Sequence, residues 1–351
     1  MVSYTCLKVL VIGGKPMKRQ IALLSLILFF LLFLFPVERI FCAPYYEGKR
    51  ITIIVGSEAG GGYDRISRTL AKHLPKYIPG NPTIIVENMV GAGSIVAANH
   101  VYSIAKPDGL TIGAPQRGVP FAQLTKTEGV RFDLMKFSWI GSAASESAIL
   151  CVRSDLPYKT FDDLLKIKDP IYLYAVGPST TDYQFPTLLK EFVGLKVKLV
   201  IYPSSSAGML AVERKEVDGG VRSYTAFKPF IERGLIRPLI RGRASEPGIE
   251  HLPVDEDLAV DKKGKMIMAM RSAGDLIGRP YVASPGTPAE IMNILRSAFA
   301  KVTKDPELIE ESKKLMITLE FAPAEECLKV LKEIFSQPED IVSEFAKYIK
   351  F

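Results

Sequence analysis

The chain has 351 residues, of which 48% are hydrophobic, enough for one large domain or two of ordinary size. Its formal charge of +7 comes partly from residues 1–43, and the remaining 40 basic and 37 acidic residues leave only +3. The sequence also has no basic run with interleaved aromatic residues. Together these features argue against nucleic acid as a partner.

Residues 1–43 have the pattern of a secretory signal peptide. Lys18 and Arg19 precede the uncharged apolar stretch 21–35, and Ala43 is a small residue at a possible cleavage point. An uncleaved anchor is the alternative, although this stretch is shorter than the roughly 20 residues of a helical span. We therefore expect a periplasmic protein, tethered to the membrane if the signal is not removed.

Residues 51–74 predict a strand, a glycine loop and a helix in succession. The β-branched run 51–55 is typical of a buried strand, and apolar residues recur every four positions over 66–74, as on one face of a helix. The three glycines at 60–62 can expose backbone amides at the start of that helix, where its dipole favours an anion. A plain tight turn is the alternative interpretation.

Two nucleotide motifs fail at this loop. A phosphate-binding loop needs a lysine, and none is present; the dinucleotide fingerprint needs glycine at position 65, which is arginine. The anion expected here is therefore a carboxylate rather than a nucleotide.

The rest of the chain alternates strands with helices, which predicts doubly wound, mainly parallel sheets with ligands at the carboxyl ends of the strands. Pro186 should make its helix start late or bend, and residues 287–290 predict a capping box. Residues 241–279 cannot be placed. Strands are expected at 82–87, 110–114, 139–141, 148–153, 171–176, 198–202, 217–221, 236–240 and 280–283; helices are expected at 95–104, from 162, over 185–192, after 204, over 227–233 and 288–304, and from about 307, 324 and 338.

No residue set points to catalysis, a metal or a cofactor. Only three histidines occur, none of them in a glycine or serine loop, and no G-x-S-x-G elbow is present. A Ser-His-Asp arrangement depends on geometry and stays open at this point. Cys151 and Cys327 lack zinc spacing and are expected to be two separate buried thiols, although a disulfide between them stays open. A binding protein is favoured over an enzyme.

An ordered set of short motifs resembles the periplasmic solute-binding receptors of tripartite tricarboxylate transporters, the Bug family. The resemblance covers about residues 45–350. Its motifs are GSEAGGGYD at 56–64, VENMVGAG at 86–93, KPDGLT at 106–111, YA at 174–175, YP at 202–203, EVD at 216–218 and ASPGTP at 283–288.

The resemblance implies two α/β lobes of the type II-like periplasmic-binding-protein fold, joined by crossing strands, with the ligand in the cleft between them. Residues 44–145 plus 275–351 would form lobe 1, and residues 146–274 would form lobe 2. It further implies a small carboxylate ligand and membrane transporter subunits as partners. We also expect a monomer without a cofactor.

The resemblance also implies which loops hold the carboxylate, largely through backbone amides. These are the loops that follow the predicted strands in both lobes. The candidate ligand-binding residues are Ser57, Ala59, Gly60, Gly61, Gly62, Tyr63, Asp64, Arg117, Gly177, Ser179, Thr180, Thr181, Asp182, Ser204, Ser205, Ser206, Ala207, Arg222, Tyr224 and Thr225.

Two arginines depart from the family pattern. Arg117 and Arg222 could bind a second, distal carboxylate bidentately, or they could neutralise Glu58 and Asp182. The first reading predicts a ligand with at least two anionic groups.

Three functions stay open. The favoured one is an exported receptor that closes two lobes around a small organic acid and delivers it unchanged to a transporter. The alternatives are a sensor subunit for a signalling partner, and a hydrolase or transferase that uses Ser or Thr with Asp64.

Overall fold

A computed structural model describes residues 43–178, 180–315 and 317–349. The predicted signal peptide lies outside these ranges, apart from Ala43. The residues from Pro44 onward form one compact unit. Within the described ranges, no helix is both long and apolar enough to cross a membrane.

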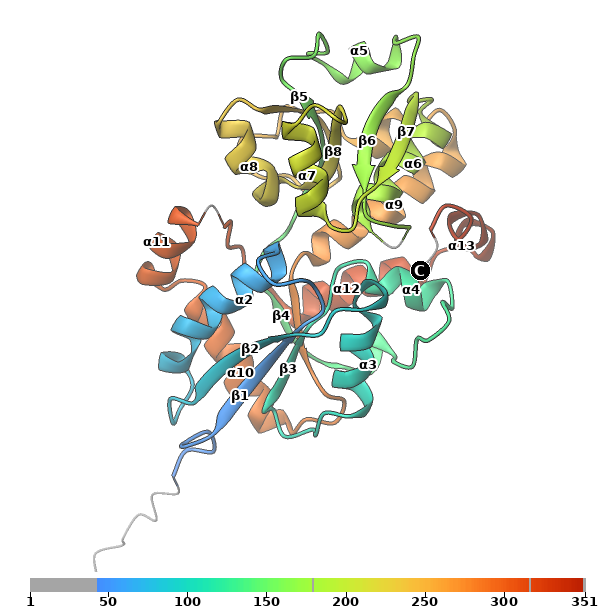
Figure 1. Cartoon of the computed structure of the whole chain (residues 1–351). Helices are drawn as coiled ribbons and strands as arrows, with labels where there is room; N and C mark the ends of the chain where they lie inside the picture. Colours follow the sequence, from blue (N-terminus) through green and yellow to red (C-terminus); the bar gives the residue numbers. More distant parts are fainter. Residues whose placement is uncertain (1–42, 179, 316, 350–351) are drawn as a thin grey trace, which may run out of the picture. The chain divides into compact units, whose positions relative to one another are not determined.

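The first sheet has six strands in the order β11-β4-β10-β3-β1-β2 (Figure 1). β1, β2 and β3 are parallel, whereas β10 is antiparallel to both of its neighbours, β3 and β4. β4 therefore runs in the same direction as β3. The strands are β1 Arg50–Val55, β2 Thr83–Asn88, β3 Thr111–Ala114, β4 Ser138–Ser142, β10 Pro280–Ala283 and β11 Ala322–Pro323.

The second sheet has five strands in the order β7-β6-β8-β5-β9. β6 is parallel to β7 and β8, and β5 is antiparallel to β8 and β9, so β5 alone runs against the other described strands. The predicted α/β class with mainly parallel sheets is confirmed. The strands are β5 Ala148–Arg153, β6 Ile171–Ala175, β7 Val197–Ile201, β8 Gly219–Ser223 and β9 Ile236–Arg241.

Helices pack on both sheets, and α9 connects their cores. α9 packs against α6, α12 and α13, and one cluster of buried apolar side chains includes residues of both sheets, such as Trp139 and Leu173. The helices are α2 Gly62–His73, α3 Ile95–Ser103, α4 Val119–Leu124, α5 Phe161–Leu165, α6 Thr181–Phe192, α7 Ser205–Glu213, α8 Tyr224–Glu232, α9 Lys262–Ile277, α10 Ala289–Val302, α11 Pro306–Lys314, α12 Ala324–Phe335 and α13 Glu339–Phe345.

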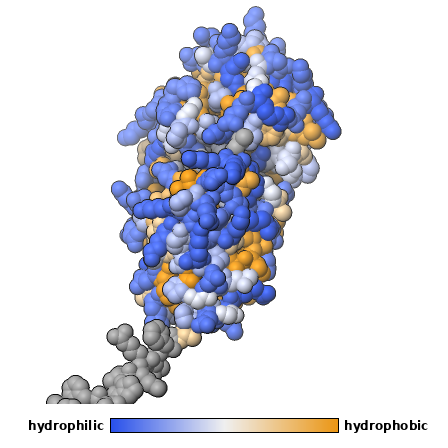
Figure 2. Space-filling model, turned by 90° about the vertical axis from the view of Figure 1, so that its left-hand side faces the viewer, coloured by the Kyte–Doolittle hydropathy of each residue, from blue (hydrophilic) through white to orange (hydrophobic). Residues whose placement is uncertain are grey.

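The molecular face in Figure 2 is mostly hydrophilic, and polar side chains interrupt its apolar patches. Scattered apolar residues of this kind are normal on a surface in contact with water. Cys151 and Cys327 are both buried and free, as expected from their spacing.

Four local predictions were wrong or incomplete. α6 begins at Thr181 with Pro186 inside it, so it does not start late. α8 begins at Tyr224, three residues before the predicted start. The capping box at 287–290 is absent from the described structure, because the Thr287 hydroxyl donates to the Ser284 carbonyl and α10 begins at Ala289. The unplaced region 241–279 contains α9.

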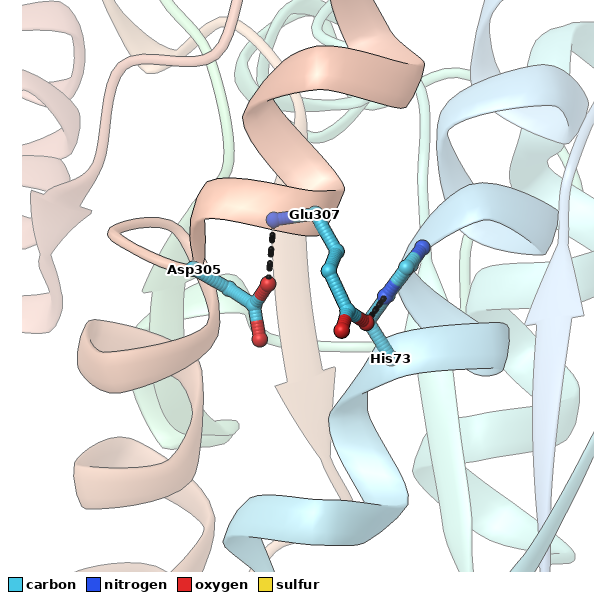
Figure 3. Close-up of side chains that lie close together, drawn as sticks. All are labelled: His73, Asp305 and Glu307. Carbon is cyan, nitrogen blue, oxygen red and sulfur yellow. Dashed lines mark hydrogen bonds and ion pairs between the residues drawn. The ribbon is translucent and has the colours of Figure 1, made fainter.

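A cluster of polar side chains joins α2 to α11 (Figure 3). His73 Nε2 lies 2.7 Å from Glu311 Oε2, and Asp305 accepts hydrogen bonds from the Glu307 and Leu308 amides at 2.8 and 3.1 Å. A metal could in principle use His73, Asp305 and Glu307, whose ligand atoms lie within 4.8 Å of one another. However, Lys76 and Tyr77 already contact the Asp305 carboxylate, so we interpret the cluster as a structural contact that holds α11 against α2.

Removing the Asp305 carboxylate should destabilise the fold. Asp305→Ala should lower the free energy of unfolding by about 1–2 kcal/mol, because the first amides of α11 lose their cap. Urea denaturation monitored by circular dichroism measures the change. Glu310→Ala is the matched control, since it removes only an exposed pair with Lys314 on the same helix and should have little effect.

The difference in the free energy of unfolding between wild type and Asp305→Ala should disappear at low pH. Burial alone would raise the pKa of Asp305, but hydrogen bonds from Lys76, Tyr77 and the α11 amides outweigh burial and hold the pKa well below its usual range. The stabilisation is therefore present above the ordinary carboxyl pKa near 4 and is lost as the pH falls toward the folded-state value. A difference between wild type and Asp305→Ala that stays constant down to about pH 2 would contradict this account.

Candidate functional site

A cavity of about 350 Å³ lies where loops of the two sheets meet. Its walls come from segments that follow the carboxyl ends of β1, β2 and β3 in the first sheet and of β6, β7 and β8 in the second. This is the place where open α/β sheets bind ligands.

Asp64 organises the first glycine loop. The residue is 2% exposed, and its Oδ2 accepts a hydrogen bond from the Gly60 amide at 2.8 Å. The side chains of Asn88 and Arg68 also bond to this carboxylate. Burial raises the pKa of Asp64, but these bonds outweigh burial and lower it overall, so the carboxylate stays ionised.

The loop places the start of α2 at the cavity. Gly61 is the residue before the helix, and among the described residues no side chain accepts from the first amides of α2. Gly61, Gly62 and Tyr63 all line the cavity. An uncapped helix start of this kind can bind an anion through its backbone amides.

Asp182 has the same role in the second sheet. It is 4% exposed; its Oδ1 accepts from the Val176 amide at 3.1 Å and from the Thr180 hydroxyl, and its Oδ2 accepts from the Ser205 hydroxyl at 3.3 Å. Burial is the largest influence and raises the pKa of Asp182 despite these bonds. No described side chain caps α6, so a second helix start is open at the same cavity.

The serine run is a helix cap, as predicted. Ser204 Oγ accepts a hydrogen bond from the Ala207 amide at 3.1 Å, and α7 begins at Ser205. Ser204, Ser205 and Ser206 also line the cavity. Their hydroxyls add polar groups to its wall in the second sheet.

Arg117 is occupied by another partner. Its Nη1 donates to the Glu146 carbonyl at 2.9 Å and lies 3.3 Å from Asp275 Oδ1. Burial would lower the pKa of Arg117, but the interactions with Asp275, Tyr63, Glu146 and Glu246 together outweigh burial and raise it. Among the described residues Arg117 thus pairs with Asp275 and not with Glu58 or Asp182, which was the alternative role left open for it, and Arg117 does line the cavity.

Arg279 is a cavity residue that sequence reasoning missed. It is 3% exposed; its Nε lies 2.5 Å from Glu146 Oε1, and its guanidinium carbon lies 4.9 Å from the Tyr63 ring centroid. A Cβ on Gly62 would come within 2.6 Å of Arg279 Nη2, so position 62 needs glycine to let the guanidinium approach the loop.

The cavity unites most of the predicted residues. Those in its lining are Ser57, Ala59, Gly61, Gly62, Tyr63, Arg117, Thr180, Thr181, Asp182, Ser204, Ser205, Ser206 and Arg222.

The other described candidates lie outside the lining. Gly60 and Asp64 hold the first loop together, and Tyr224 packs in the apolar core of the second sheet. Gly177, Ala207 and Thr225 are also not in the lining, and Ser179 lies outside the described residues. Besides Arg279, the lining includes Gln116, Glu146 and residues 91–94, most of which belong to the quoted VENMVGAG motif.

Two buried glutamates lie close to the segments that connect the sheets. Glu246 Oε1 accepts a hydrogen bond from the Ser147 amide at 2.9 Å, and Glu146 pairs with Arg279. Burial, followed by the negative charge of Glu146, raises the pKa of Glu246 to about 7. Glu246 therefore holds a proton over a pH range in which an exposed glutamate has lost it.

This raised pKa predicts a pH-dependent stability. The protonated Glu246 contributes stability that is fully present below the ordinary glutamate pKa near 4.3 and is lost as the pH rises through about 7. Glu246→Gln, which mimics the protonated form, should therefore gain stability relative to wild type between pH 6 and 8 in urea titrations. Exposed Glu232→Gln is the control, and identical profiles for the Glu246 variant and wild type would refute the assignment.

Residues 66–345 match the model of the tripartite tricarboxylate transporter family receptor. The chain belongs to this family. The resemblance inferred from the motifs is thus confirmed, and the protein is a solute-binding receptor of this class.

Relatives of the receptor include two UPF0065 proteins. One, from Bordetella pertussis, is 26% identical over 274 residues, which cover 76% of this chain and 80% of the relative. The other, the UPF0065 protein in the TAR-I ttuE-ttuC' intergenic region of Agrobacterium vitis, is 27% identical over 270 residues, which cover 76% of this chain and 74% of the relative.

Solved structures share the fold. The periplasmic binding protein BugD superposes with a TM-score of 0.67 at 21% identity, covering 87% of this chain and 100% of BugD. MatC (Rpa3494) from Rhodopseudomonas palustris with bound malate has a TM-score of 0.65 at 19% identity, covering 84% of this chain and 99% of MatC. R. palustris Rpa4515 with adipate has a TM-score of 0.67 at 19% identity, covering 86% of this chain and 99% of Rpa4515. The predicted two-lobe periplasmic-binding-protein fold is confirmed.

Proposed function

We propose that this receptor captures a small organic carboxylate in the cavity between the loops of its two sheets and delivers it unchanged to the membrane subunits of a tripartite tricarboxylate-type transporter. One observation carries the proposal: the uncapped starts of α2 and α6 both reach the same cavity of about 350 Å³. Two such helix starts can hold one carboxylate without a dedicated positive side chain.

In this proposal the loop amides bind the ligand, and two buried aspartates keep the loops folded. The amides of Gly62, Tyr63 and Thr181 hold the carboxylate, while Asp64 and Asp182 keep their loops folded and do not themselves touch the ligand. The hydroxyls of residues 204–206 complete the polar wall. Malate and adipate, which occupy the structures of MatC and Rpa4515, indicate the size of ligand that this fold can enclose.

A catalytic role has less support. No histidine or cysteine is present among the described residues that line the cavity, so its serine and threonine hydroxyls have no neighbouring imidazole to activate them. We further propose that the receptor works as a periplasmic monomer, which stays tethered to the membrane if its signal is not cleaved. Lobe 1 would comprise residues 44–145 and 275–351, and lobe 2 residues 146–274.

A proline at the start of α6 tests the backbone-amide claim. Thr181→Pro removes one amide hydrogen, and the fold should tolerate it, because proline suits the first helical position and Thr180 already has the extended backbone that precedes proline. Thr181→Ala is the matched control, since it removes the hydroxyl and keeps the amide.

We expect malate, succinate or adipate to bind in isothermal titration calorimetry and to raise the midpoint of thermal unfolding. Thr181→Pro should weaken that binding roughly tenfold or more, the cost of one hydrogen bond to a charged group, and Thr181→Ala far less. Equal affinities for the two variants would refute the role of the α6 amides. If no carboxylate binds the wild type, the proposed function itself is wrong.

A further inference from the structure

Three arginines from different elements bring positive charge to the cavity region. Arg65 lies in the first turns of α2, Arg279 directly precedes β10, and Arg222 lies in β8. Arg222 and Arg279 line the cavity. The pKa of Arg65 is lowered first by burial and then by the positive charges of Arg279 and Arg222, so Arg65 lies within electrostatic range of both.

Part of this charge lacks a partner within the described ranges. Arg279 uses Nε to bind Glu146, but its Nη1 is buried without any hydrogen bond partner. The backbone of Arg222 pairs with Ile149 in the second sheet, but its side chain has neither an ion pair nor a hydrogen bond to another described residue. Arg117 differs, because Asp275 and the Glu146 carbonyl already occupy it.

The described acidic residues around the cavity do not pair with the free parts of these guanidinium groups. Asp182 is held by three hydrogen bonds from its own loop and from Ser205, and it attracts Arg222 only at longer range. Glu146 binds the Nε of Arg279, and Glu58 is exposed. A negatively charged group of the ligand would supply what the described acids do not.

We propose that Arg222 and Arg279 bind a second anionic group of the ligand directly, so that this receptor selects dicarboxylates over monocarboxylates. The proposal rests on the proposed function, in which the helix starts hold the first carboxylate. Guanidinium groups match carboxylate geometry and can donate two parallel hydrogen bonds. Sequence reasoning paired Arg222 with Arg117; the present proposal pairs Arg222 with Arg279 instead, because Arg117 already binds Asp275.

The two arginines come from different sheets, so an anionic group bound by both would contact both sheets. Arg222 belongs to the second sheet, whereas Arg279 leads into the first. Like charges that converge on one cavity repel each other when it holds no anion, and an anion between them replaces that repulsion with attraction. A dianion therefore stabilises the state in which both sheets contribute to the cavity, and a monoanion does so less.

Calorimetry with ligands of equal length tests this inference. We would titrate adipate against hexanoate and succinate against butyrate, since each pair has the same carbon number and differs by one carboxylate. The wild type should prefer the dicarboxylate. Arg222→Gln should weaken dicarboxylate binding roughly 10- to 100-fold and leave monocarboxylate binding nearly unchanged, because only the second carboxylate loses its partner.

Two further variants separate binding from folding. Arg214→Gln changes an exposed arginine at the end of α7 and should alter neither affinity. Arg279→Lys keeps the buried positive charge beside Glu146 but loses the planar fork, and it should lower dicarboxylate affinity while the midpoint of thermal unfolding stays near that of wild type.

The outcomes distinguish the two proposals. If wild type binds both ligand classes equally, or if Arg222→Gln weakens both to the same degree, the second anionic site is wrong and the carboxylate receptor stands. If none of the four acids binds, both proposals fail. A selective loss of dicarboxylate affinity in Arg222→Gln supports both.

Discussion

Two buried carboxylates, each in the first turn of a helix, set the shape of the binding loops. Asp64 accepts from the Gly60 amide, and Asp182 accepts from the Val176 amide. Because each acid bonds to the loop before its own helix, that loop is folded without using the first amides of the helix as its partners. The cavity depends on this arrangement, since the open helix starts of both sheets line it.

Several buried ion pairs involve residues of the segments that connect the two sheets. Arg271 bonds Asp255 at 2.9 Å, Arg117 lies 3.3 Å from Asp275, and Arg279 lies 2.5 Å from Glu146. Removing one member of such a pair leaves an unpaired buried charge, which is strongly destabilising. These pairs lie near the segments that connect the two sheets, so they fix the positions of Arg117 and Arg279 at the cavity wall.

Local patterns in the sequence were sufficient for the first binding unit. The apolar run before Gly60 and the four-residue spacing after it predicted β1, the loop and α2, and the ordered motifs predicted the family. α9 was missed because Arg271 and Asp275 are buried polar residues that interrupt its apolar pattern. Arg279 was missed because its approach to Gly62 joins residues more than two hundred positions apart, and no local pattern encodes such a contact.

Native mass spectrometry of the gently purified full chain tests the central claim, that the cavity holds a small organic acid, most directly. The account predicts an added mass of a small acid in the native spectrum that disappears after denaturation, and its exact mass would identify the ligand and its number of carboxyl groups. A co-purified molecule without any acidic group, bound stoichiometrically and lost on denaturation, would contradict the account.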